Sequence, residues 1–242
     1  MQIVADTHTH SIISGDAHST IYENIMAAKA RGLKFLCLTD HVNSVPRAAA
    51  PEYFISLCSL PREFEGVRLL RGCEVNITDY EGHLDMPEKT LDWLDVVVAS
   101  LHDVVIKPSS KADHTQCWLA VADNPHVDII GHCGDPRFSF DLNTVIPVFG
   151  KKRKIVEINN HSFTGLRTGS KEVCKQVALA CMQYDVPIVV SSDAHFMGSV
   201  GVFDHALAML QSINFPEELI LNADEKRFAA FVSSRHGSSE KA

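Results

Sequence analysis

Short runs of β-branched and other apolar residues alternate along this chain with segments of helical periodicity, and this alternation constrains the fold more than any other feature. The strand-like runs are residues 2–5, 35–39, 67–75, 96–101, 127–131, 155–159 and 188–191. Helices are predicted at residues 20–31, 52–60, 113–122, 142–149, 171–184 and 203–212. Strands that alternate with helices form parallel β-α-β units. Seven such units predict an α/β fold, a closed or nearly closed (β/α)7 barrel.

No linker, low-complexity stretch or internal repeat divides the chain, so residues 1–242 are predicted to form a single domain. The first helix begins with Thr20-Ile-Tyr-Glu23, a capping-box pattern that satisfies amide hydrogens at a helix start. The last residues, SSRHGSSEKA, are polar, and we expect residues 235–242 to fray.

The charge and the apolar pattern exclude several classes of partner. A formal net charge of −8 provides no positive field for long nucleic acid or an anionic membrane. No apolar run approaches the roughly 20 residues of a membrane helix, and the start MQIVADTHTH is too polar for a signal peptide. The seven cysteines form no CxxC pair, which predicts reduced, mostly buried thiols. A cytoplasmic protein is therefore expected.

Most of the strand-like runs end in a side chain that can bind a metal ion. These residues are His8 and His10 after the first run, Asp40 and His41 after the second, Glu74 in the third, His102 and His132 after the fourth and fifth, and Asp193 and His195 after the seventh. In a parallel barrel these strand ends converge on one face, where barrel enzymes build their active sites.

A single histidine is more often a satisfied polar group or a surface residue than a ligand. We assign no role to the histidines that lie away from strand ends, namely His83, His114, His126, His205 and His236. His114 and His205 are predicted to lie on helix surfaces. The match of the remaining ligands to the strand ends favours a real site.

The donor set indicates the metal. Imidazole and carboxylate ligands suit zinc, manganese or iron(II) better than magnesium or calcium, which prefer oxygen ligands. Nine candidates are too many for one tetrahedral ion, so two to three ions are expected, zinc foremost. A carboxylate such as Glu74 can bridge two ions, and such a pair activates water for attack on a phosphoryl group.

The order of these motifs resembles the PHP (polymerase and histidinol phosphatase) superfamily, and above all its branch of small, YcdX-like bacterial phosphatases and phosphoesterases. The resemblance covers nearly the whole chain and rests on DTHTHS, LTDH, LRGCEVNI, ASLHD, IIGHCGDP, VEINN and VSSDAH. It implies a distorted (β/α)7 barrel, a trinuclear metal site and phosphatase activity. It also suggests a homo-oligomer, for which the residues show no interface signature.

The resemblance also implies a ligand for each ion. His8, His10, Glu74 and Asp193 match the first ion's ligands, and Glu74, His102 and His132 match the second's, with Glu74 bridging. His41, His195 and Asp16 match the third. The small phosphatase branch resembled here has histidine at position 16, whereas other branches of the family have aspartate, so this sequence departs from that branch there, and His18 is a rival ligand.

The implied reaction is hydrolysis of a small phosphate monoester by a hydroxide that bridges the ions, with Glu74 and Asp193 as the catalytic carboxylates. Arg137 and Arg167 follow the ends of the fifth and sixth runs and are candidates to hold the phosphate, and Arg167 also matches an arginine of the family. His161 either protonates the leaving oxygen or lines the pocket. His18 is a candidate substrate contact.

Three other functions stay open. An amidohydrolase also begins with HxH, but it has eight strands and often bridges its metals with a carboxylated lysine at the fourth strand, where this chain has His102. A PHP-type phosphodiesterase or exonuclease would act on short nucleotides, because the chain has no obvious basic groove. A non-catalytic metal-binding or polymerase-accessory module is disfavoured by the complete ligand set.

Overall fold

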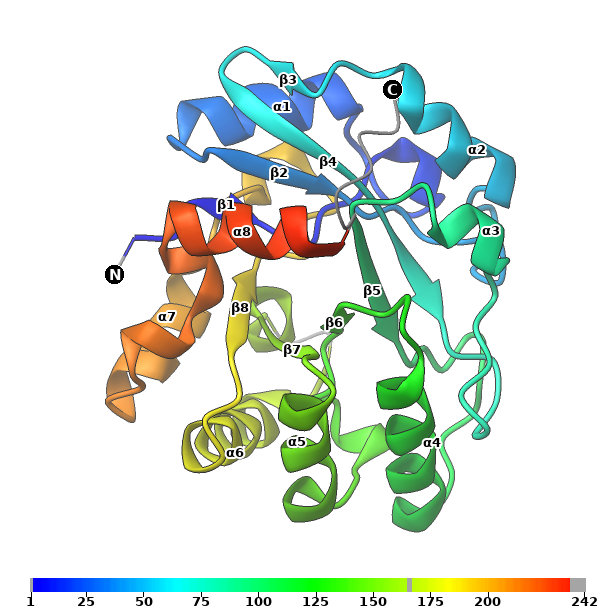
Figure 1. Cartoon of the computed structure of the whole chain (residues 1–242), viewed down its shortest axis with the longest axis vertical. Helices are drawn as coiled ribbons and strands as arrows, with labels where there is room; N and C mark the ends of the chain where they lie inside the picture. Colours follow the sequence, from blue (N-terminus) through cyan, green and yellow to red (C-terminus); the bar gives the residue numbers. More distant parts are fainter. Residues whose placement is uncertain (1, 165–166, 236–242) are drawn as a thin grey trace.

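The computed structural model of the protein describes residues 2–164 and 167–235. Its centre is a nearly closed barrel of seven parallel strands in the order β1-β2-β4-β5-β6-β7-β8 (Figure 1). The strands are β1 (Ala5–Asp6), β2 (Phe35–Leu38), β4 (Val67–Asn76), β5 (Val96–Ser100), β6 (Ile129–Ile130), β7 (Ile155–Asn159) and β8 (Ile188–Ser191). A short strand β3 (Glu63–Phe64) pairs antiparallel with β4. The predicted (β/α)7 architecture is therefore confirmed.

Helices cover the outside of the barrel. They are α1 (Ile21–Ala30), α2 (Pro51–Ser56), α3 (Glu88–Leu91), α4 (Lys111–Asp123), α5 (Leu142–Lys151), α6 (Ser170–Gln183), α7 (Asp204–Ser212) and α8 (Glu225–Arg235). Figure 1 shows α4, α5 and α6 side by side along one flank. The predicted capping box of α1 is present, because Thr20 accepts from the Glu23 amide while Glu23 accepts from the Thr20 amide. In the described part of the chain, no helix has the length and hydrophobicity to cross a membrane.

The sequence located some elements better than others. The strands predicted at 155–159 and 188–191 are confirmed to the residue, whereas the first strand was predicted too early and the fifth too long. The prediction missed α8, whose Phe228 and Val232 are buried and whose Ala229 and Phe231 pack against the same cluster. Of the tail expected to fray, residues 235–242, only Arg235 is described, as the last residue of α8. Its remainder, 236–242, lies outside the described residues.

The side chains inside the barrel change from apolar to polar along the direction of the strands. Near the amino ends, inward side chains such as Leu70, Val96 and Val189 pack on Phe228 of α8 and form an apolar plug. Because every second residue of a strand lies on the same face, Glu74 lies on the face of Leu70 in β4, and Glu157 lies on the face of Ile155 in β7. Apolar packing therefore fills the amino half of the barrel, and buried polar groups fill the carboxyl half.

An asparagine side chain closes the seam between β1 and β8. Asn222 Nδ2 donates to Ala5 O at 2.8 Å and to Val190 O at 2.7 Å, and its Oδ1 accepts from Val190 N at 3.0 Å. The Asn222 carbonyl accepts from Val4 N at 2.9 Å. The amide group thus replaces the strand-to-strand hydrogen bonds that β1 and β8 would otherwise leave unmade.

Candidate metal centre

Glu74, at the carboxyl half of β4, lies at the centre of a buried group of histidines. Its side chain is 1% exposed. The histidine nitrogens around its two carboxylate oxygens lie at 3.3 Å (His8 Nε2), 3.6 Å (His10 Nε2), 2.8 Å (His41 Nδ1), 3.4 Å (His102 Nε2) and 2.9 Å (His132 Nε2). The ends of four strands, β1, β2, β5 and β6, thus bring five imidazoles to one carboxylate.

Asp193 supplies a second buried carboxylate just after β8. Its Oδ1 lies 3.2 Å from His10 Nε2, 3.7 Å from His8 Nε2 and 3.5 Å from His195 Nδ1. Its backbone has φ 54, a left-handed conformation that a non-glycine residue rarely adopts. The hydrogen bond from Asp193 N to His8 O at 2.9 Å fixes this conformation. Such backbone strain is concentrated at functional sites.

Asp16 faces the cluster from the loop after β1. Its Oδ2 lies 3.6 Å from His41 Nε2 and 3.5 Å from His195 Nε2. The Asp16 side chain is 43% exposed, so it is the most accessible carboxylate of the group. His18, two residues further, lines the neighbouring pocket and has no ion pair with these groups in the described structure.

Several buried polar atoms of this cluster have no hydrogen-bond partner among the described residues. They are His8 Nε2, His10 Nε2, His41 Nδ1 and Glu74 Oε2. They approach oppositely charged groups but without hydrogen-bond geometry, and a buried polar group left in this way costs about 1–3 kcal/mol. Metal ions of the zinc class would satisfy all four, since they accept nitrogen and oxygen ligands. The donor set therefore fits such ions.

Three groups of ligand atoms are compact enough to hold an ion, with all their atoms within 4.8 Å of one another. The groups are His8, His10 and Asp193; His10, His41 and His195; and His41, Glu74 and His102. His10 and His41 each belong to two groups, so the sites adjoin.

A second layer of residues orients the imidazoles. His8 Nδ1 donates to Glu157 Oε1 at 2.7 Å, and His102 Nδ1 donates to Asn76 Oδ1 at 2.7 Å. His10 Nδ1 lies 2.9 Å from Ser14 Oγ, which itself donates to Asp40 Oδ1 and so accepts from the histidine. Since each Nδ1 carries the proton, each Nε2 presents its lone pair to the cluster.

The sequence analysis missed this second layer. Glu157 is buried and also accepts from Ser191 Oγ and from the His132 amide, both at 2.5 Å. Glu157 lies in the VEINN run and Asn76 in LRGCEVNI, but neither residue was assigned a role; strand parity, which puts Glu157 on the inward face of β7 with Asn159, could have found it. Ser14 carries no such signal, since serine is common in turns.

The carboxylates and histidines of the cluster shift one another's pKa values. Burial would raise the pKa of Glu74, but His8, His102 and His41 hold it well below its ordinary value. Burial likewise opposes a charge on His195, yet Asp16 and Asp193 raise its pKa to about 9. Burial lowers the pKa of His102 to about 4. Glu74 therefore stays ionised beside a neutral His102, which suits cation binding.

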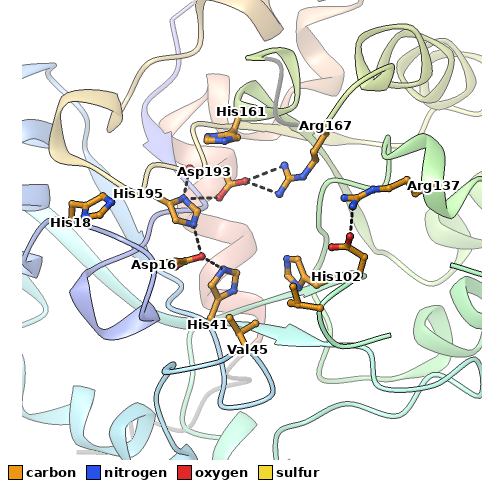
Figure 2. A pocket seen from close by; sticks show the side chains of 12 residues that line it. Asp16, His18, His41, Val45, His102, Arg137, His161, Arg167, Asp193 and His195 are labelled. Atoms are coloured by element: carbon orange, nitrogen blue, oxygen red, sulfur yellow. Dashed lines mark hydrogen bonds and ion pairs between the residues drawn. The ribbon is translucent and has the colours of Figure 1, made fainter. Parts of the chain in front are cut away.

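A pocket of about 490 Å³ opens above the cluster (Figure 2). It is lined by Asp16, His18, His41, Val45, His102, Asp103, Val104, Arg137, His161, Arg167, Asp193 and His195. All four predicted substrate contacts, His18, Arg137, His161 and Arg167, are thus brought to one cavity. Arg167 Nη1 and Nη2 each lie 3.3 Å from Asp193 Oδ2, which places its guanidinium beside the cluster.

The described histidines that were assigned no role lie away from the cluster, but the position predicted for one of them was wrong. His114 is 1% exposed, not on the surface of α4. Its Nδ1 donates to Ser139 O at 2.8 Å and its Nε2 accepts from Ser109 N at 2.9 Å, so burial leaves no polar atom unpaired. His205 is exposed on α7 as predicted, and His236 lies outside the described residues.

A (β/α)7 barrel with a buried histidine and carboxylate cluster at its carboxyl end defines a barrel protein of the metallohydrolase class. Comparison with known proteins agrees: the PHP domain model matches residues 6–161. A probable phosphatase of Clostridium botulinum (strain Langeland) is 43% identical over 235 residues, which cover 97% of this chain and 96% of the relative. A probable phosphatase of Thermoanaerobacter sp. (strain X514) is 43% identical over 236 residues, with the same coverage.

A solved structure shares the fold. Histidinol phosphate phosphatase from Lactococcus lactis subsp. lactis, complexed with zinc, L-histidinol and phosphate, superposes with a TM-score of 0.65 at 16% identity, covering 89% of this chain and 95% of that one. The chain belongs to the PHP family, and it is a hydrolase.

Proposed function

We propose that this protein is a metal-dependent phosphatase that hydrolyses small phosphate monoesters at a site of two to three zinc-class ions. The observation that carries the proposal is the convergence of unpartnered buried ligand atoms beneath a pocket that also holds Arg167. When bound, ions of this class lower the pKa of water and neutralise phosphoryl oxygens. Zinc is the first expectation, and manganese or iron would also suit this donor set.

The ligands divide into three adjoining sets. His8, His10 and Asp193 would hold the first ion, and His102 and His132 the second, with Glu74 between the two. His41, His195 and Asp16 would hold the third. The distances around Glu74 support its bridging role, because both carboxylate oxygens face histidines of different strands.

The protein's own side chains would orient the phosphate. Arg167 presents its guanidinium edge beside Asp193, where a phosphoryl oxygen can accept two hydrogen bonds. His161 lines the same cavity and lies near His195, with ring centroids 5.9 Å apart. We assign it to the side of the leaving oxygen. The relatives named probable phosphatases, and the zinc and phosphate in the Lactococcus lactis structure, support this assignment.

A substrate panel tests the proposal. Protein stripped with a chelator and protein reconstituted with zinc or manganese are assayed on phosphomonoesters, phosphodiesters including short nucleotides, and cyclic amides. We expect metal-dependent hydrolysis of the phosphomonoesters above all. Preferred cleavage of phosphodiesters would instead identify a phosphodiesterase or exonuclease, and preferred cleavage of cyclic amides an amidohydrolase. Elemental analysis that returns fewer than two ions after reconstitution would refute the multinuclear site.

A further inference from the structure

The two arginines of the pocket differ in how far their charge is already compensated. Among the described residues, the Arg167 guanidinium makes two 3.3 Å contacts with Asp193 and one of 3.4 Å with Ser162 Oγ. Arg137, in contrast, has a carboxylate at every guanidinium nitrogen: Nε and Nη2 donate to Asp135, the latter at 2.6 Å, and Nη1 donates to Asp103 Oδ2 at 2.5 Å. Figure 2 shows Arg167 joined to Asp193, whereas Arg137 enters the pocket from the opposite side and contacts a different carboxylate. Arg137 is thus poorly suited to bind a phosphate.

Asp103 is the carboxylate that Arg137 holds at the pocket wall. It follows His102 in the loop after β5, lines the cavity, and is 43% exposed at its side chain. Its Oδ2 accepts from Arg137, while its Oδ1 accepts no hydrogen bond from the described residues. Lys107 Nζ contacts only the backbone oxygen of Asp103, at 2.7 Å. The pocket therefore contains a fixed, unused acceptor beside the cluster.

The charges around Asp103 determine which ligand groups can approach it. Asp103 and Asp135 compensate Arg137 and the exposed Lys107, so the wall attracts no further anion. A neutral or cationic hydrogen-bond donor can approach Oδ1 without repulsion, whereas a carboxylate or second phosphate would meet Asp103 directly. Val45 and Val104 line the same cavity and offer apolar contact to a carbon chain.

We propose that Asp103 is a specificity-determining residue that accepts a hydrogen bond from an amino or hydroxyl group on the alcohol portion of the substrate, while Arg167 faces the phosphate. This inference rests on the proposed phosphatase function. It defines a substrate class: phosphate monoesters of short aliphatic alcohols that carry a hydrogen-bond donor. Esters that carry a second anionic group are poor substrates.

A matched series of esters tests this assignment. Aminopropyl, hydroxypropyl, n-butyl and carboxyethyl phosphates have chains of similar length and differ at the terminal group. We expect the reconstituted wild-type protein to have higher kcat/KM for the amino and hydroxyl esters than for the other two. The first two arms also show which donor is preferred. In Asp103→Asn, Arg137 loses a compensating charge, so kcat/KM should fall for the donor-bearing esters and rise for carboxyethyl phosphate. The ratio between them should change at least about tenfold.

Two further variants keep the test decisive. Asp103→Ala should shift the ratio in the same direction, which excludes an effect peculiar to the introduced amide. Asp123→Asn makes the same chemical change in an exposed ion pair at the end of α4, where Asp123 Oδ1 lies 2.5 Å from Lys152 Nζ, and should leave the ratio unchanged. Hydrolysis with an unaltered ratio in both Asp103 variants would overturn this inference alone. Failure of the reconstituted protein to hydrolyse any of the esters would overturn the phosphatase function and this inference with it.

Discussion

The two ends of the barrel differ in whether their buried polar groups have hydrogen-bond partners. At the amino end, Asp95 is 3% exposed and accepts two hydrogen bonds from Arg62 Nη1, at 2.8 and 2.6 Å, and one from Arg71 N at 2.8 Å. Lys154, 5% exposed, donates to Asn124 O at 2.6 Å and to Val127 O at 2.7 Å. At the carboxyl end, four atoms of the cluster have no hydrogen-bond partner among the described residues, namely His8 Nε2, His10 Nε2, His41 Nδ1 and Glu74 Oε2.

This difference in hydrogen bonding indicates that the amino end of the barrel contributes mainly to stability and the carboxyl end mainly to function. Hydrogen bonds at the amino end offset part of the cost of burying these charged groups, whereas the unpaired atoms at the carboxyl end retain that cost until an ion binds. The apolar plug that α8 completes lies between the two ends. Substitutions at the carboxyl end should therefore mainly change activity and metal content, and those at the amino end should mainly change the free energy of unfolding.

The largest effect is expected for Glu74→Gln. The amide keeps the shape of the side chain but removes the charge shared by five histidines, so the rate of phosphomonoester hydrolysis should fall by at least about 10²-fold. Steady-state assays of the zinc-reconstituted variant and wild type measure this loss. Activity within a few-fold of wild type would show that Glu74 does not bridge ions.

A smaller effect should distinguish Asp16 from His18. Asp16 faces His41 and His195, so Asp16→Ala should lower the metal content by about one ion and reduce activity severely. His18→Ala should retain all ions and change mainly KM, because His18 lines the pocket but has no ion pair with the cluster in the described structure. Elemental analysis with steady-state kinetics measures both. Metal lost from His18→Ala and retained in Asp16→Ala would reverse the assignment.

At the amino end, Asp95→Ala should lower the free energy of unfolding by about 2 kcal/mol, since it leaves the Arg71 amide without its acceptor. Its kcat/KM should stay within about twofold of wild type, as the residue lies outside the pocket. Urea unfolding of the metal-loaded protein measures the first quantity. Asp92→Ala is the matched control, because that carboxylate is 57% exposed. Equal destabilisation by both variants would contradict the distinction between the two ends.

The smallest effect concerns the pH dependence of stability. Burial lowers the pKa of Lys154 from 10.5 to about 8. Between these values the unfolded chain binds the proton and the folded chain does not, so this residue makes the free energy of unfolding rise with pH. The difference between wild type and Lys154→Met should therefore grow from pH 8 to pH 10.5. Lys152→Met, at an exposed neighbour, should show no such trend. A flat difference for Lys154→Met would show that its pKa is not lowered.

The sequence by itself determined the architecture and the inventory of the site. Seven apolar runs with helices between them specify parallel strands, because burial on both faces requires continuous apolar residues. Because side chains of a strand alternate between its two faces, His8, Glu74 and the other candidate ligands can point into the barrel at the carboxyl ends of the strands. Both properties depend on neighbours in sequence, which explains why β7 and β8 were predicted to the residue.

The tertiary structure alone decided which atoms meet. Asn222 closes the barrel with a residue 217 positions away, and Glu157 orients His8 across 149 positions. His114 is buried because Ser139 and Ser109 come to both of its nitrogens, and Arg137 is neutralised because Asp103 reaches it from another loop. Local propensity carries no information about such pairs, since they form only when the loops of separate β-α units pack together at one end of the barrel.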